Sequence, residues 1–94
     1  MTHQDAQSNI YRIANKYNRK LPEIGDTYKH FKGNIVTIVS IAIDTENLTP
    51  LVVYKHDNTI WARPLEMFLS EVDKEKYPNT SQIYRFEFEE IKDV

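Results

Sequence analysis

The chain has 94 residues (11.1 kDa), and its 40% hydrophobic and 28% charged residues are typical of one globular domain rather than a disordered segment. A net charge of −2 does not indicate a nucleic-acid or membrane partner, and the absence of Cys excludes a disulfide scaffold, a thiolate zinc site and a cysteine nucleophile. No apolar run is long enough to span a bilayer and no signal segment begins the chain, so we expect a cytoplasmic protein.

The charges divide the chain into two parts. Residues 1–32 hold six basic and three acidic groups, whereas residues 33–94 hold six basic and eleven acidic groups. We therefore expect a basic N-terminal arm with a helix (residues 1–24) and an acidic β-rich domain (residues 25–94). The opposite charges could dock the arm onto the domain or leave it free for an acidic partner, and both readings stay open.

The arm is predicted to contain one amphipathic helix. Ser8 is a candidate N-cap, and Pro22 disfavours helical backbone just before it, so we expect the helix to end near Lys20. Four apolar residues follow at the spacing of one helical face: Ile10, Ile13, Ala14 and Tyr17. Four basic residues lie mainly off that face: Arg12, Lys16, Arg19 and Lys20.

Five short strands are predicted after the arm, over residues 27–32, 35–43, 51–56, 59–63 and 83–88. The second is rich in β-branched residues and apolar on both faces, so we expect both of its faces to be buried, one of them under the N-terminal helix. Asp57 and Asn58 suit a tight hairpin turn because both tolerate positive φ. Pro64 is expected to open a short helix whose inward-facing residues are Leu65, Phe68 and Leu69.

These elements predict a mainly β fold. The short strands and tight connections favour a small SH3-like barrel of about five antiparallel strands, with an N-terminal helix and a short helix before the last strand. Periodicity alone does not establish that the sheet closes.

Four motifs resemble a bacterial family. YKHFKG (residues 28–33), LVVYK (51–55), WARPLEMF (61–68) and YRFE (84–87) occur in the order and spacing of domain-of-unknown-function family 1653 (DUF1653). The resemblance implies a compact SH3-like barrel and no established activity. The arm is an addition to the family pattern, and the turn over residues 56–59 is shorter than the family's loop.

A candidate ligand-binding rim comprises His30, Trp61, Arg63, Glu66 and Arg85. Arg63 and Arg85 could offer planar guanidinium groups to a carboxylate or phosphate. Stacking surfaces beside them would come from Tyr28, Tyr54 or Trp61. The alternative is structural: Arg63–Glu66 or Arg85–Glu87 forms an internal ion pair and the aromatic residues fill the core.

His30 is the one candidate for catalysis. It could act as a general base if a carboxylate such as Glu66 lies beside it, in a small hydrolase of a phosphorylated or nucleotide substrate. The alternative is a packed histidine that hydrogen-bonds the backbone. No nucleophile triad is recognisable, the three histidines (His3, His30 and His56) lack metal-ligand spacing, and two glycines cannot build a phosphate-binding loop, so we expect no metal or cofactor.

The leading hypothesis is therefore a non-enzymatic binding module for a protein or nucleic-acid partner, without a membrane partner. The chain is expected to be a monomer or a weak homodimer that pairs through the exposed edge of its last strand. A nucleic-acid-binding accessory protein is the alternative, with the basic helix residues (Arg12, Lys16, Arg19 and Lys20) as the interface. Those four residues also fit an ordinary solvated helix face.

Overall fold

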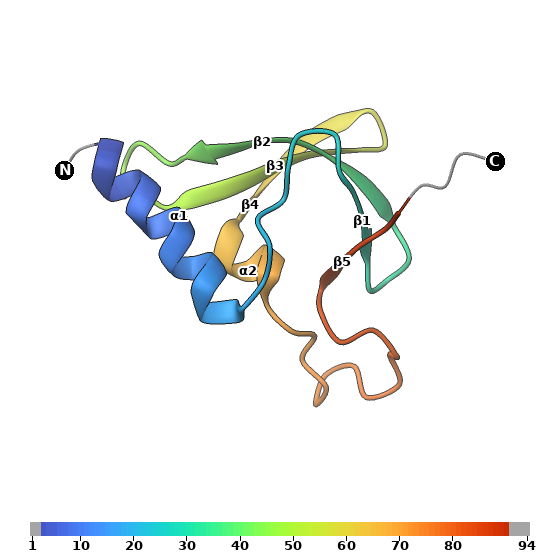
Figure 1. Cartoon of the computed structure of the whole chain (residues 1–94). Coiled ribbons are helices and arrows are strands. Elements are labelled where there is room, and N and C mark those ends of the chain that lie inside the picture. The colour runs from blue at the N-terminus through green and yellow to red at the C-terminus, as the bar shows by residue number, and fades with distance from the viewer. Residues whose placement is uncertain (1–2, 91–94) are drawn as a thin grey trace.

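Five strands form one antiparallel sheet in the order β4-β3-β2-β1-β5, and two helices accompany it (Figure 1). The computed structural model describes residues 3–90. The elements, in chain order, are α1 (His3–Tyr17), β1 (Thr27–His30), β2 (Ile35–Ile43), β3 (Pro50–His56), β4 (Thr59–Pro64), α2 (Leu65–Leu69) and β5 (Phe86–Phe88). The predicted class, mainly β with an N-terminal helix and a short helix before the last strand, is confirmed. Among these residues no helix is long and apolar enough to cross a membrane.

The predicted barrel is not confirmed, because the sheet is open. β4 and β5 are its two edges and do not pair with each other. β5 is only three residues long, since the chain before it leaves the sheet: the Arg85 amide donates to the Ser70 carbonyl at 3.0 Å, and the Ile83 and Tyr84 amides donate to Glu87 Oε2. The last strand is therefore shorter than the predicted residues 83–88.

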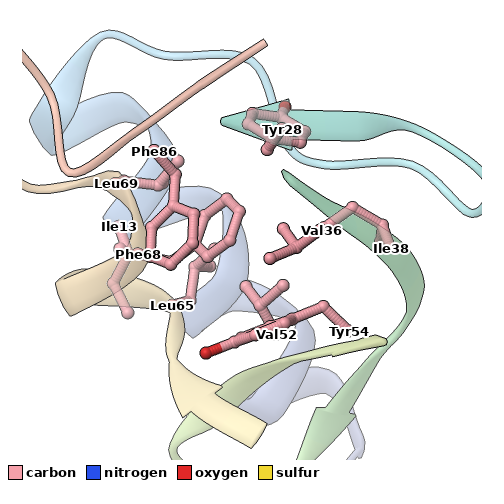
Figure 2. Packing of buried hydrophobic residues seen from close by; sticks show 10 residues of the cluster. All are labelled: Ile13, Tyr28, Val36, Ile38, Val52, Tyr54, Leu65, Phe68, Leu69 and Phe86. Carbon is pink, nitrogen blue, oxygen red and sulfur yellow. The ribbon is translucent and has the colours of Figure 1, made fainter. Parts of the chain in front are cut away.

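The hydrophobic core lies on the concave face of the sheet, between the strands and both helices (Figure 2). At its centre the rings of Phe68 and Phe86 stack with centroids 4.2 Å apart, and Tyr28 meets Phe68 edge to face at 5.1 Å. Ile13 from α1 belongs to this cluster, as does Val52 from β3. The short helix contributes the three residues predicted to face inward, Leu65, Phe68 and Leu69, and all of them are fully buried.

β2 has the predicted bounds, but the prediction that both of its faces are buried is wrong. Its first half alternates between buried residues such as Val36 and exposed ones such as Ile35 (46% exposed). α1 does not cover the convex face, because it packs against α2 and β3 on the concave side (Figure 1). The convex face consequently carries the exposed side chain of Ile35 and, from the edge strand β4, that of Ile60.

The helix boundaries differ from the prediction at both ends. Ser8 is not an N-cap, since α1 already includes His3. The helix ends at Tyr17 rather than near Lys20, because Asn18 takes a left-handed conformation (φ 51°). The Arg19 amide then donates to the Ala14 carbonyl and the Asn18 amide to the Asn15 carbonyl, each at 3.1 Å, which is the Schellman arrangement that closes a helix.

Two turns fix the hairpins that carry the site. Asp57 and Asn58 both have positive φ (57° and 61°), as predicted for a two-residue hairpin between β3 and β4. Between β1 and β2 the Gly33 amide donates to the His30 carbonyl at 2.8 Å, with Gly33 at φ 105°. β1 therefore ends at His30, two residues before its predicted end.

Candidate functional site

A cavity of about 200 Å³ opens on the concave face of the sheet, which we call the inner-face cavity. The sheet register builds it: Trp61 lies opposite Tyr54 and Arg63 opposite Val52 across β3 and β4, and His30 lies opposite Phe86 across β1 and β5. Side chains alternate along a strand, so these residues point to one face of the sheet. Its walls include His30, Tyr54, His56, Trp61, Arg63 and Phe86.

Arg63 supplies the charge in this cavity. Its guanidinium carbon lies 5.4 Å from the centroid of the Phe86 ring, a cation–π contact. Among the side chains of residues 5–90, and the backbone of residues 3–90, the guanidinium has no ion-pair partner and no hydrogen-bond acceptor. No carboxylate of the residues that the structure describes lines the cavity. The five hydrogen-bond donors of this half-buried guanidinium are thus available to a ligand.

His30 is a neutral imidazole. Burial lowers its pKa to about 4, and the positive charges of Arg63, Lys32 and Arg85 act in the same direction. Its Nδ1 accepts a hydrogen bond from the Lys32 amide at 3.2 Å, so the proton of the neutral ring is on Nε2. The ring packs against Phe31 and Phe86, with centroids 4.5 and 4.8 Å away.

Trp61 is the only tryptophan in the chain, and it is 49% exposed at the cavity. Its indole N–H donates to the His56 carbonyl at 3.2 Å, across the β3–β4 hairpin. The His56 ring in turn has its Nδ1 3.3 Å from the Ile35 carbonyl. The indole is therefore held in place by the hairpin while one side of it remains open to a ligand.

The structure brings together three of the five predicted rim residues, namely His30, Trp61 and Arg63. Glu66 lies elsewhere, on α2, where its Oε1 accepts hydrogen bonds from Lys16 Nζ at 2.6 Å and from the Tyr17 hydroxyl at 3.2 Å. These bonds hold the pKa of Glu66 below its usual value. Glu66 is consequently not the carboxylate partner that the catalytic prediction required for His30.

Arg85 is near the cavity without lining it. Its charge contributes to the lowered pKa of His30, and its Nε is buried without a hydrogen-bond partner among residues 3–90. Neither of the alternative ion pairs is formed in this part of the chain, since Glu66 pairs with Lys16 and the Glu87 carboxylate accepts backbone amides. Phe86 and His56 were not predicted as site residues, because only the strand register reveals that they share this face.

The four basic residues predicted for the helix differ in their contacts, and two of them, Arg19 and Lys20, follow the end of α1 at Tyr17. Lys16 forms an ion pair with Glu66, and Arg19 donates hydrogen bonds to the carbonyls of Leu69 (3.0 Å) and Phe86 (2.7 Å). Lys20 lies 3.8 Å from Glu23, and Arg12 donates to Asn9 of its own helix. Two of the four residues predicted as a nucleic-acid interface therefore connect α1 to the rest of the fold.

No metal centre is apparent in the described part of the chain, where no three His, Asp or Glu side chains are grouped closely enough to hold an ion. His3, one of the three histidines considered from the sequence, belongs to α1, but its side chain lies outside the described part.

A family model described as a protein of unknown function (DUF1653) matches residues 26–88. The match spans all five strands and α2 and leaves α1 outside. Neither a curated protein nor a solved structure matches the chain significantly.

Proposed function

The chain belongs to the DUF1653 family, a family of unknown function, and from the geometry of its cavity we propose that it is a non-enzymatic binding module that holds a carboxylate of its ligand against Arg63. The observation that carries the proposal is that, in the described part of the chain, the half-buried Arg63 guanidinium has no acceptor and no carboxylate lines the cavity around it. A planar guanidinium matches a carboxylate through two parallel hydrogen bonds.

The size of the cavity supports a small anionic group rather than a large substrate. Its volume of about 200 Å³ is below the range of roughly 300–1,000 Å³ typical of sites that enclose whole small molecules. The aromatic walls formed by Tyr54, Trp61 and Phe86 suit the apolar part that bears the carboxylate. An acidic or C-terminal residue of a peptide has this combination of groups.

The state of His30 favours binding over hydrolysis. A general base needs a free ring nitrogen and a pKa near the working pH. In His30 the nitrogen without a proton already accepts the Lys32 amide, and the pKa is about 4. The imidazole is better suited to donate an Nε2–H hydrogen bond to an anion than to abstract a proton.

The test uses Trp61 as the reporter and benzoate as the probe, with benzamide as the matched neutral compound. Benzoate is expected to change the indole fluorescence or the indole N–H resonance saturably, and benzamide is not. Arg63→Ala should weaken benzoate binding about tenfold or more, since a hydrogen bond to a charged group contributes about 1.5–3 kcal/mol. Arg12→Ala removes an equal charge from the exposed face of α1 and should bind like the wild type.

Thermal unfolding of each variant completes the experiment. If Arg63→Ala retains a cooperative transition and loses benzoate, the proposal stands. Equal binding of benzoate and benzamide, or benzoate binding unaffected by Arg63→Ala, would refute it. Loss of cooperative unfolding in Arg63→Ala would make Arg63 a structural residue; Arg63→Lys, which keeps the charge but not the planar donor pair, then decides whether the carboxylate geometry matters.

A further inference from the structure

A second and larger cavity, of about 430 Å³, lies between the β1–β2 turn and the segment that joins α2 to β5; we call it the loop cavity. Figure 1 shows that segment as the orange loop beyond α2. The ring of Phe31, in the turn, meets the ring of Tyr77, in the loop, edge to face with centroids 4.9 Å apart. Lys32, Lys76 and Pro78 also line the cavity, whereas no carboxylate of the described residues does.

The loop is held in one shape by its own polar groups. Residues 70–85 contain no helix and no strand, apart from a single β-bridge between Glu71 and Tyr84, and connections longer than roughly 12–15 residues without helix or strand are usually functional or disordered. Lys74 Nζ donates to the carbonyls of Thr80 (2.8 Å) and Gln82 (3.0 Å), and the Asp73 carboxylate accepts the Glu75 amide at 3.0 Å. These bonds fix the wall of the cavity before any ligand arrives.

Two lysines at this cavity differ from Lys74 in having no acceptor. Lys32 Nζ lies 5.3 Å from the centroid of the Tyr77 ring and Lys76 Nζ lies 5.6 Å from it. Neither ammonium group has a hydrogen-bond acceptor or a carboxylate partner among the side chains of residues 5–90 or the backbone of residues 3–90. Two unpaired cations thus share one aromatic ring, within residues 25–94, whose eight basic and twelve acidic groups give a negative net charge.

We propose that the loop cavity binds a phosphate monoester, with the phosphate between Lys32 and Lys76 and its organic group against Tyr77 and Pro78. Lysine ammonium groups are compact, strongly hydrated point charges that suit a phosphate, and flexible stems let two of them approach one dianion. The cavity volume falls within the range of small-molecule sites and leaves room for the group that carries the phosphate.

The experiment records amide resonances of the full chain at low ionic strength during titration with inorganic phosphate, phosphotyrosine and adenosine monophosphate. Saturable shifts are expected at the amides of Lys32, Lys76, Tyr77, Asn79 and Thr80. Lys32→Ala/Lys76→Ala should weaken binding about tenfold or more, because charge-assisted contacts are lost. Lys29→Ala/Lys55→Ala, which removes the same charge at two exposed sites that do not line the cavity, should leave binding unchanged.

The three probes distinguish the sources of the phosphate. Tighter binding of phosphotyrosine indicates a phosphorylated protein, and tighter binding of adenosine monophosphate indicates a nucleotide. Equal binding of all three probes would contradict the placement of an organic group against Tyr77 and Pro78. The proposal fails if no probe shifts these resonances saturably, or if both double variants weaken binding equally. A response confined to the Trp61 indole would support the inner-face cavity and overturn the loop cavity, so the two proposals fail separately.

Discussion

His30 has a basic side chain that is uncharged at neutral pH in this fold. Its ring is packed between Phe31 and Phe86, and the guanidinium of Arg63 is close enough to oppose a second positive charge. The hydrogen bond from the Lys32 amide to Nδ1 requires that nitrogen to be unprotonated. Burial between aromatic rings, repulsion by the charge of Arg63 and the hydrogen bond to Nδ1 therefore all favour the uncharged imidazole.

The low pKa of His30 makes folding stability depend on pH in a defined window. In the unfolded chain the imidazole takes up a proton as the pH falls through its ordinary value of 6.5, whereas in the folded protein it does so only at about 4. Unfolding therefore binds a proton between these values, and the contribution of His30 to stability, complete above pH 6.5, is lost as the pH falls towards 4. His30→Asn keeps an acceptor for the Lys32 amide and does not titrate.

Urea unfolding between pH 7 and 4.5 checks this prediction. The free energy of unfolding should fall less steeply with decreasing pH in His30→Asn than in the wild type, although the variant is less stable throughout because it loses ring packing. The titration of the carboxylates contributes equally to the pH dependence of both proteins and therefore cancels when the two are compared. A His30 pKa near 6.5, measured from its ring-proton resonances, would contradict the prediction directly.

Arg19 attaches the helix α1 to the rest of the fold. It follows the left-handed Asn18, and from there its guanidinium reaches the carbonyls of Leu69 at the end of α2 and Phe86 in β5. It also lies 4.1 Å from the centroid of the Tyr84 ring. Burial lowers the pKa of Arg19, but a guanidinium remains charged at any physiological pH. One side chain therefore connects three elements.

Arg19→Ala is expected to cost about 2–3 kcal/mol of unfolding free energy, since hydrogen bonds from a charged group contribute about 1.5–3 kcal/mol and a cation–π contact about 0.5–1 kcal/mol. Arg19→Lys should recover little of this, because one ammonium group does not reproduce the planar pair of donors. The exposed Arg12, on α1 itself, is the control, and its replacement by Ala should lower the free energy of unfolding by less than about 0.5 kcal/mol. Chemical unfolding measures all three, and equal effects of Arg19→Ala and Arg12→Ala would disprove the role.

The elements show which parts of the fold local sequence determines. The bounds of β2 and the turn at Asp57 and Asn58 were predicted correctly because β-branched runs and tolerance of positive φ are local properties. The start of α1 was missed because a polar first turn gives no apolar signal, and its end because the left-handed Asn18 competes with continued helix.

The site was predictable only in part, for a related reason. His30, Trp61 and Arg63 were grouped from their residue types and motifs, whereas Phe86 joins them through the β1–β5 register, which no local pattern contains. Glu66 was assigned to the rim, but its side chain follows the outer face of α2 towards Lys16. The pairing of distant elements decided each of these outcomes.

At the scale of the whole molecule, the helix that lies outside the family match contributes to the core. The match covers residues 26–88, yet Ile13 is 6% exposed and belongs to the same cluster as Leu65 and Phe68. The ion pair between Lys16 and Glu66 joins the basic arm to the acidic domain at 2.6 Å. Both side chains are largely exposed, so apolar burial and Arg19 contribute more to this attachment than the pair does.

Deletion of residues 1–24 should therefore lower the free energy of unfolding by more than any single substitution on the surface. Burial of one side chain such as Ile13 contributes about 1.5–3 kcal/mol, and the deletion also removes the other apolar side chains of the arm that pack on the core. Small domains are stable by only about 5–15 kcal/mol in total. The fragment of residues 25–94 is expected to unfold over a broad range and to bind a hydrophobic dye, because α2 is uncovered. Ile13→Ala in the full chain is the graded control: it should lose about 2–4 kcal/mol and still unfold cooperatively. A fragment that melts as sharply and at as high a temperature as the full chain would show instead that the arm and the domain are independent.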